Sequence, residues 1–260
     1  MIAQESINQL IELSNQYNSE RWFEGDPIIF PKHFARLMQG KPGISGLGRR
    51  TGCGSEDWTV GFVPSLKDVE IAGVIAAHLA WGRRDMIIRD CKRAFDEMDW
   101  QPYRYVMAGK YKDDDTSLHR TIKWSEFTAI CSNLKEFYTT NNSLEELDAD
   151  QMRVNIFSQK SNPKAANKKI HMFRRWMVRN DGIVDLGLWK NTSPSELVIP
   201  LDVHVHRSAT NLGITERKSA DFTTAQEITE FLKTIFPEDP CKGDFALFAY
   251  ASKKLKEKQE

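Results

Sequence analysis

The segment from Leu66 to Gly82, LKDVEIAGVIAAHLAWG, constrains the fold more than any other stretch of this chain. Its apolar residues recur three and four positions apart, which places them on one face of a helix with 3.6 residues per turn. These residues are Val69, Ala72, Ile75, Ala76, Leu79 and Ala80. Gly82 supplies a stop signal directly after them. The segment therefore predicts a core helix.

Helical patterns also run through most of the remaining chain, whereas strand patterns are few and short. Helices are expected over 2–19, 31–38, 84–98, 124–139, 163–179, 203–212 and 224–236, with a short one capped by Ser143 and a last one from about 239. Strands are expected at 186–189 and 197–199, a polar loop at 111–120, and a glycine-rich loop insertion at 40–65. These patterns predict an all-α fold.

Composition excludes several classes of protein. The 260 residues carry 36 basic and 36 acidic side chains, so no global positive field indicates a nucleic-acid partner. No apolar run reaches the roughly 18 residues of a membrane span, and the N-terminus lacks the pattern of a signal peptide. The four cysteines are scattered without a C-x-x-C pair, which predicts free thiols in a reducing cytoplasm and neither a zinc ribbon nor a cysteine-ligated cluster.

Charge is distributed unevenly along the chain. Residues 151–180 contain eight basic side chains and no acidic one. The basic residues are Arg153, Lys160, Lys164, Lys168, Lys169, Arg174, Arg175 and Arg179. Such a run is compatible with a solvated helix face, and it is equally the pattern of a contact with a phosphate backbone.

The stretch IPLDVHVHR, Ile199 to Arg207, allows three interpretations. In a strand, Asp202, His204 and His206 would project on one face as metal ligands of a hydrolase. In a helix, Asp202 would instead be the N-cap, or a catalytic carboxylate held at the helix start. Helical spacing of the later apolar residues, followed by Gly213, favours the helix.

A glycine-rich turn occurs at ISGLGRRTG, residues 44–52. Two glycines in such a turn can direct backbone amides at a phosphate, as in a helix-hairpin-helix turn. The flanking sequence is rich in glycine and proline, which favours a loop.

Two late segments resemble a known superfamily. IPLDVHVHRSATNLGI and EDPCKGDFALFAYA resemble, in this order, segments of the helix-hairpin-helix DNA glycosylases, in particular the 8-oxoguanine branch that includes the archaeal type. DVEIAGVIAAHLAWGRR and AANKKIHMFRRWMVRNDGIVDLGLWK resemble an uncharacterised bacterial family related to that branch. The resemblance to proven glycosylases covers about 160–252, and that to the bacterial family about 20–252. It implies a two-lobed helical bundle with approximate lobes 20–160 and 161–252.

The resemblance also implies roles for individual residues. Lys168 matches the lysine of lyase-capable members, with Lys164 and Lys169 as weaker matches, and Asp202 matches the catalytic aspartate. A base pocket would be lined by Met172, Asp244 and Phe248. Contacts with DNA phosphates would come from Lys164, Lys169, Arg174, Arg175 and Arg207.

The implied activity is excision of an oxidised purine such as 8-oxoguanine from double-stranded DNA, through a lysine Schiff base assisted by an aspartate. No cofactor, metal or iron–sulfur cluster, no membrane and no obligate protein partner is expected. Where the superfamily has a glycine-rich hairpin before the lysine, this chain has QKSNPKAANKK. A catalytically inactive nucleic-acid-binding relative on the same scaffold is the alternative.

Overall fold

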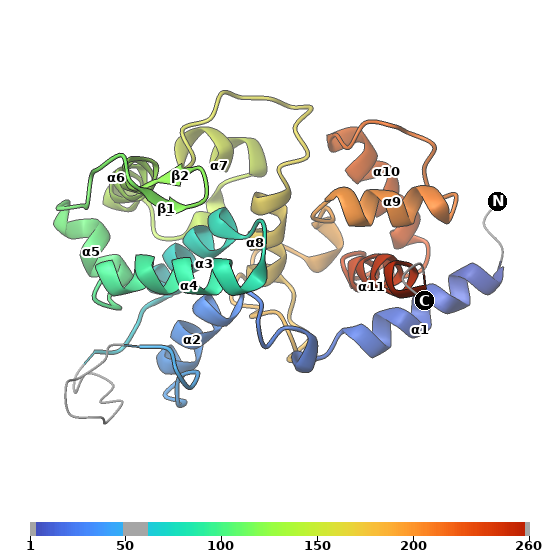
Figure 1. Ribbon diagram of the computed structural model, residues 1–260, viewed down its shortest axis with the longest axis horizontal. Coiled ribbons are helices and arrows are strands. Elements are labelled where there is room, and N and C mark those ends of the chain that lie inside the picture. The colour runs from blue at the N-terminus through green and yellow to red at the C-terminus, as the bar shows by residue number, and fades with distance from the viewer. Residues whose placement is uncertain (1–3, 49–61, 258–260) are drawn as a thin grey trace. The chain divides into compact units, whose positions relative to one another are not determined.

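The structure is a computed structural model that describes residues 4–48 and 62–257, with side chains described as far as Tyr250 (Figure 1). Its described part is mostly helical, with one two-stranded hairpin, so the expectation of a helical fold is confirmed at this level. Two compact units divide the chain: the central unit, Glu24–Ser161, and the terminal unit, Met1–Phe23 with Asn162–Glu260. No helix in the described residues is long and apolar enough to cross a membrane.

The central unit is organised around helix α3 (Leu66–Leu79). Eleven of its fourteen residues are buried, which confirms the predicted core helix and shows that it is enclosed on more than the one apolar face expected. It packs against three other helices of the unit. The remaining elements are α2 (Ile29–Met38), α4 (Arg84–Glu97), α5 (Pro102–Ala108), β1 (Ser117–His119), β2 (Ile122–Lys123), α6 (Trp124–Thr140), a 3-10 turn (Leu144–Glu146) and α7 (Ala149–Asn155).

The start of α3 is fixed by a capping box. The backbone N and the Oγ of Ser65 both donate to Oδ2 of Asp68 at 2.8 Å. Oδ1 of the same carboxylate accepts from the backbone N of Tyr103 at 2.9 Å, which ties the start of α5 to α3. One buried aspartate therefore satisfies donors from two helix starts.

Glu70 is a second buried acid on α3 and leads to a stability prediction. It is 0% exposed and accepts from the hydroxyls of Tyr138, at 2.7 Å, and Ser143, at 2.5 Å, and from the backbone N of Leu144, at 3.2 Å. Glu70→Leu removes the acceptor for all three donors. We expect it to lower the free energy of unfolding by about 3 kcal/mol in a urea titration.

The matched control for Glu70 is Glu136→Leu, a change of the same kind at an exposed position of α6. It should shift the unfolding free energy by no more than about 0.5 kcal/mol. Equal losses in the two variants would show that the three hydrogen bonds contribute nothing specific.

The structure corrects the strand assignments. Residues 186–189 and 197–199 are not strands; in the described part of the chain the strands are β1 and β2, which pair antiparallel with His119 opposite Ile122. β1 lies within the stretch expected to be a polar loop, and Arg120 in the turn has φ 53°. Strands of three and two residues are too short for a period-two pattern to stand out in the sequence.

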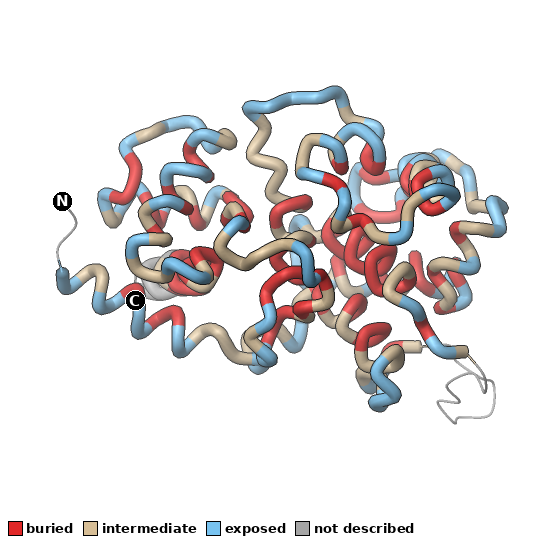
Figure 2. Tube along the Cα trace, turned by 180° about the vertical axis from the view of Figure 1, so that it is seen from behind, coloured by how far each residue is buried: buried red, intermediate tan, exposed pale blue. Residues whose placement is uncertain are grey.

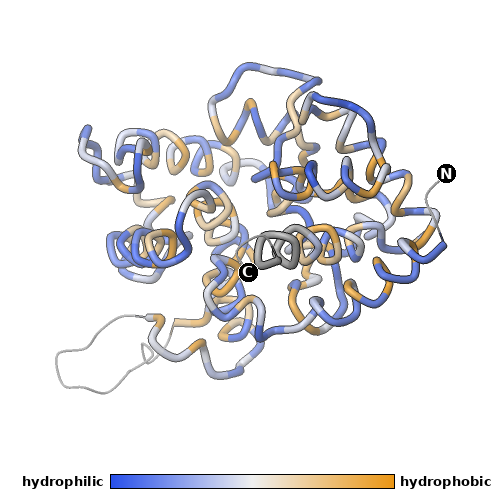
Figure 3. The backbone as a smooth tube through the Cα atoms, turned by 45° about the vertical axis from the view of Figure 1, so that its right-hand side comes forward, coloured by the Kyte–Doolittle hydropathy of each residue, from blue (hydrophilic) through white to orange (hydrophobic). Residues whose placement is uncertain are grey.

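The terminal unit contains both ends of the chain. Helix α11 (Lys242–Glu257) packs against α1 (Gln4–Tyr17) and α9 (Val203–Asn211). Along α1, the buried positions Leu10, Leu13 and Ser14 lie between exposed ones, and hydrophobic positions likewise lie between hydrophilic ones (Figures 2 and 3). The other elements are 3-10 turns at Glu20–Trp22 and Pro194–Glu196, α8 (Lys168–Val178) and α10 (Phe222–Lys233).

Helix α8 begins later than predicted. Asn162 and Pro163 lie before it in a turn, and Lys168 is its first residue. The N-cap, Asn167, has φ 44°, a left-handed conformation that asparagine tolerates better than most residues. That conformation interrupts any helix arriving from residue 163. Two short helices, α5 and α7, were not predicted either.

Other sequence expectations have mixed outcomes. Cys91, Cys131 and Cys241 are buried free thiols, and burial raises the pKa of each. Residues 49–61, which include Cys53, half of the expected 40–65 insertion and the end of the glycine-rich turn at 44–52, lie outside the described residues.

Candidate active site

Lys168 and Asp202 meet in the terminal unit. Nζ of Lys168 lies 3.7 Å from Oδ2 of Asp202, and the two side chains are 38% and 20% exposed. Each stands at the start of a helix: Lys168 is the first residue of α8, and Asp202 is the N-cap of α9. The distance is that of an ion pair without a hydrogen bond, so the amine keeps its donors for another group. The residues that the sequence paired are therefore neighbours.

The two oxygens of the Asp202 carboxylate make different contacts. Oδ1 accepts from the backbone N of His204 at 2.8 Å and of Val205 at 2.9 Å, which is an N-cap. Oδ2 is the atom that faces Lys168. The cap fixes the direction of the carboxylate. The cap and the candidate catalytic acid are thus the same group.

A buried carboxylate, Asp244, adjoins this pair. It is 6% exposed, and its Oδ2 accepts from a guanidinium nitrogen of Arg175 at 2.8 Å, while Oδ1 has no hydrogen-bond partner. Burial raises the pKa of Asp244 to about 6; Arg175 opposes the rise, the charge of Asp202 adds to it, and Lys168 opposes it. The charges of Asp202 and Lys168 therefore act on the Asp244 carboxyl.

The two other predicted pocket residues frame this site along their helices. Met172 follows Lys168 by one turn of α8 and is half-buried. Phe248 follows Asp244 by one turn of α11 and is 41% exposed, which is unusual for a phenylalanine in a helix whose other described apolar positions are buried. Both have accessible apolar surface one helical turn from a charged group of their own helix.

The structure corrects the prediction that Arg175 contacts a DNA phosphate. It is 5% exposed, with its guanidinium bound to Asp244 and its Nε 3.4 Å from Oδ1 of Asp185. A side chain that is buried and paired with two carboxylates cannot also bind a DNA phosphate at the surface. Its role is structural, and it holds Asp244 in place.

The remaining predicted phosphate contacts lie nearer the surface. Lys164 and Arg207 are exposed, and Lys169 is half-buried. Arg174 is also half-buried, with its guanidinium 5.7 Å from the ring centroid of Trp189. Burial therefore does not exclude these four as predicted phosphate contacts.

Arg179 continues the buried ion-pair network that begins at Arg175. It is 1% exposed and donates to both carboxylate oxygens of Asp239 and to Asp185, with Asp181 at 3.2 Å. Only the basic members of this network stand together in the sequence, because the acids come from other segments. The available signal was Asp185, a single acid between apolar neighbours in IVDLGLW.

The metal-site interpretation of the stretch after Asp202 finds no support. Residues 203–211 form α9, so His204 and His206 point to different sides of a helix. Nε2 of His206 lies 2.8 Å from the backbone O of Arg217 and is engaged there. Within the described residues, no three histidine, cysteine, aspartate or glutamate side chains are grouped to hold a metal ion.

His171, on the first turn of α8, yields a pH prediction. It is 5% exposed, stacks on Phe222 with ring centroids 5.9 Å apart, and burial lowers its pKa to about 4. Between pH 6.5 and 4 the unfolded chain binds a proton at this residue that the folded protein does not, so its stability contribution falls as pH falls. Between pH 7 and pH 4 we therefore expect the free energy of unfolding of the wild type to fall by about 3 kcal/mol relative to that of His171→Leu.

The measurement for His171 is urea unfolding of both proteins at several pH values. Asp244 acts in the opposite direction, because its raised pKa lets the folded protein take up a proton as pH falls from about 6. That contribution is present in both proteins and cancels in their difference. Parallel stability curves for the two proteins would refute the prediction.

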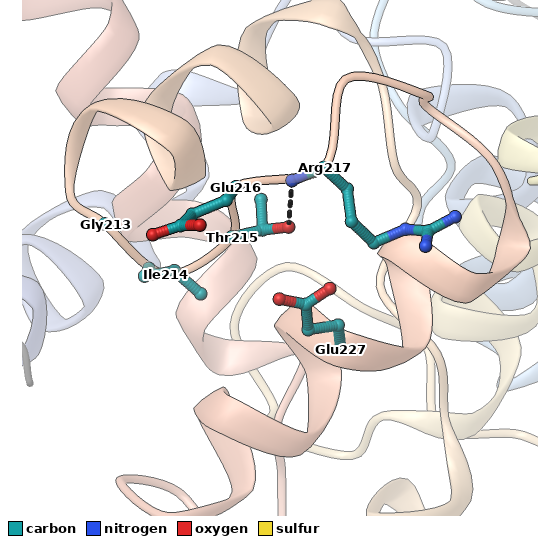
Figure 4. Close-up of a pocket in the computed structure, with 6 residues that line it drawn as sticks. All are labelled: Gly213, Ile214, Thr215, Glu216, Arg217 and Glu227. Atoms are coloured by element: carbon teal, nitrogen blue, oxygen red, sulfur yellow. Dashed lines mark hydrogen bonds between the residues drawn. The ribbon is translucent and has the colours of Figure 1, made fainter.

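A separate hollow of about 470 Å³ lies at the end of α9 (Figure 4). Its lining includes Glu216 and Glu227, while the Arg217 guanidinium turns toward Thr224, to which it donates at 2.8 Å. The hollow contains none of the predicted site residues and is distinct from the Lys168 site.

Comparison with protein-family models matches residues 60–159 and 148–252 to a family described as a protein of unknown function (DUF2400). The matched stretches span both units and include Lys168, Asp202 and Asp244. No curated protein and no solved structure matches the chain.

Proposed function

Starting from the premise that this chain belongs to the DUF2400 family of unknown function, we propose that it is a DNA glycosylase with an associated lyase activity. Its substrate class is an oxidised purine, such as 8-oxoguanine, in double-stranded DNA. The fold would be the two-lobed type of the helix-hairpin-helix glycosylases. The observation that carries the proposal is the 3.7 Å approach of Lys168 Nζ to Asp202 Oδ2.

The lysine supplies the nucleophile. A target base inside a duplex is out of reach, so it must first be flipped into a pocket. The ammonium of Lys168 first gives up a proton to solvent, and the resulting neutral amine attacks C1′ of the sugar. The bond from C1′ to the base breaks, and the base leaves with the electron pair and takes up a proton. Loss of a proton from the nitrogen and opening of the sugar ring give a Schiff base. Removal of a C2′ proton from that Schiff base expels the 3′ phosphate and nicks the strand.

Asp202 acts on charge rather than as a nucleophile. As the base leaves, positive charge develops on the sugar, and a fixed carboxylate beside it stabilises that transition state. Oδ2 is available for this role because the helix cap occupies Oδ1. A carboxylate that is already oriented needs no reorganisation during the reaction.

The test is reductive trapping. Borohydride reduces a Schiff base to a stable amine, so wild-type protein incubated with duplex DNA containing 8-oxoguanine should yield a covalent protein–DNA adduct. Lys168→Gln should abolish the adduct, whereas Lys190→Gln, at an exposed lysine outside the site, should leave it unchanged.

The alternative is a nucleic-acid-binding relative without catalysis, which the absence of a glycine-rich hairpin before Lys168 keeps open. Duplex binding without any adduct, on oxidised-base or abasic DNA, would favour this alternative and end the lyase proposal.

A further inference from the structure

Trp81 is an exposed tryptophan at the end of α3 in the central unit. It keeps 39% of its surface exposed, whereas Trp100, Trp124, Trp176 and Trp189 are buried. The guanidinium of Arg120, in the hairpin turn, lies over its ring at 4.1 Å from the centroid. An arginine stacked on an indole forms a flat cationic and aromatic surface.

The surroundings hold this pair in place. His119 is 0% exposed, and both of its ring nitrogens are hydrogen-bonded. Nε2 lies 2.9 Å from the backbone O of Trp81, and Nδ1 lies 2.8 Å from Oδ2 of the buried Asp90. Gly82 has φ +100°, a backbone conformation that residues with a Cβ rarely adopt, so glycine suits the turn directly after Trp81. The hairpin turn and the end of α3 are therefore locked together beneath an exposed surface.

The charge around the pair is strongly positive for a chain with no net charge. Residues 81–93 hold five basic and two acidic side chains. The buried Asp90, 1% exposed, forms ion pairs with Arg89 and Arg93, and those two arginine side chains are 60% and 44% exposed. Arg83 and Arg84, which follow Gly82, are both exposed, and Arg83 donates to the exposed Asp85 at 2.8 Å.

We propose that Trp81 and Arg120, with Arg83, Arg84 and Arg89, form a second nucleic-acid contact that binds an unpaired base and its flanking phosphates. We refer to these five residues as the Trp81–Arg120 surface. The part-exposed indole and the guanidinium stacked on it supply a surface for base stacking, and the nearby arginines supply phosphate contacts; this is the combination by which proteins bind single strands. The inference rests on the proposed function only for the class of partner, and none of its residues belongs to the Lys168 site.

The experiment is a fluorescence titration of the full-length protein with oligothymidylate of about twelve nucleotides. Stacking of a base on Trp81 should quench tryptophan emission. Trp81→Ala and Arg120→Ala should each weaken binding by roughly 10-fold or more, and Trp81→Phe should keep most of the affinity while losing the quenching. Arg83→Ala or Arg89→Ala should reduce the slope of log affinity against log salt by about 0.7.

Arg104→Ala is the matched control, because Arg104 is an exposed arginine of the same unit on α5, and its binding should equal that of the wild type. Circular dichroism melting of each variant shows whether it is folded. Unchanged binding by a folded Trp81→Ala protein overturns the inference, as does a wild type that binds duplex DNA but not the single strand.

These outcomes are separable from those of the trapping test. If Lys168 forms the adduct and Trp81→Ala binds normally, the surface is refuted and the proposed function stands. If the single strand binds through Trp81 but no adduct forms, the surface stands and the lyase proposal falls. A wild type that binds no nucleic acid refutes both.

Discussion

Asp202→Asn is expected to slow Schiff-base formation by a factor of roughly 100 to 1,000 while leaving stability nearly unchanged. The rate loss is that of removing one preorganised group that stabilises transition-state charge. Stability is retained because asparagine caps a helix about as well as aspartate does, so the two amide hydrogen bonds of residues 204 and 205 persist. The measurements are single-turnover trapping rates and thermal unfolding.

Asp202→Ala separates the two roles of this residue. It removes both the cap and the charge, so it should lose about 1 kcal/mol of stability in addition to the rate. If Asp202→Asn traps DNA at the wild-type rate, Asp202 is a structural cap and has no part in the reaction.

Arg179→Met is expected to destabilise the protein by about 3–5 kcal/mol, more than any other single change considered. The side chain is 1% exposed and neutralises Asp185 and Asp239. Removing one partner of a buried ion pair leaves an uncompensated charge inside the protein. Urea unfolding measures the loss, and Lys233→Met, which breaks a surface pair with Glu230, should stay within about 0.5 kcal/mol.

A second substitution tests the physical cause of that loss. Asp185 is buried, and burial raises its pKa even with both arginines present. Adding Asp185→Asn to Arg179→Met removes the carboxylate that lost its partner, so the double variant should be more stable than Arg179→Met alone. Additive losses from the two substitutions would contradict the account of the network.

Local sequence rules predicted the start of α9 correctly. An apolar run, a proline and an acid come before helical spacing, and Asp202 is the N-cap. The same rules placed the start of α8 too early, because Pro163 is a good first residue of a helix. The left-handed conformation of Asn167, which moves the start to Lys168, leaves no periodic signal.

The basic residues of α8 pair with acids that are distant in the sequence, and local patterns do not predict such pairs. Arg175 and Arg179 belong to a run without acids and were interpreted as surface charge. In the fold they are buried, because Asp185, Asp239 and Asp244 reach them from a following loop and from the region where α11 begins. Pairing across such separations depends on tertiary structure, and that pairing also determines the environment of Asp244.

The central claim is that Lys168 attacks the sugar, and mapping the trapped adduct by mass spectrometry tests it most directly. Wild-type protein reduced with borohydride on 8-oxoguanine duplex DNA should carry the nucleotide remnant on the side chain of Lys168. A remnant on Lys164 or Lys169, or no covalent product from either oxidised-base or abasic DNA, would contradict the account.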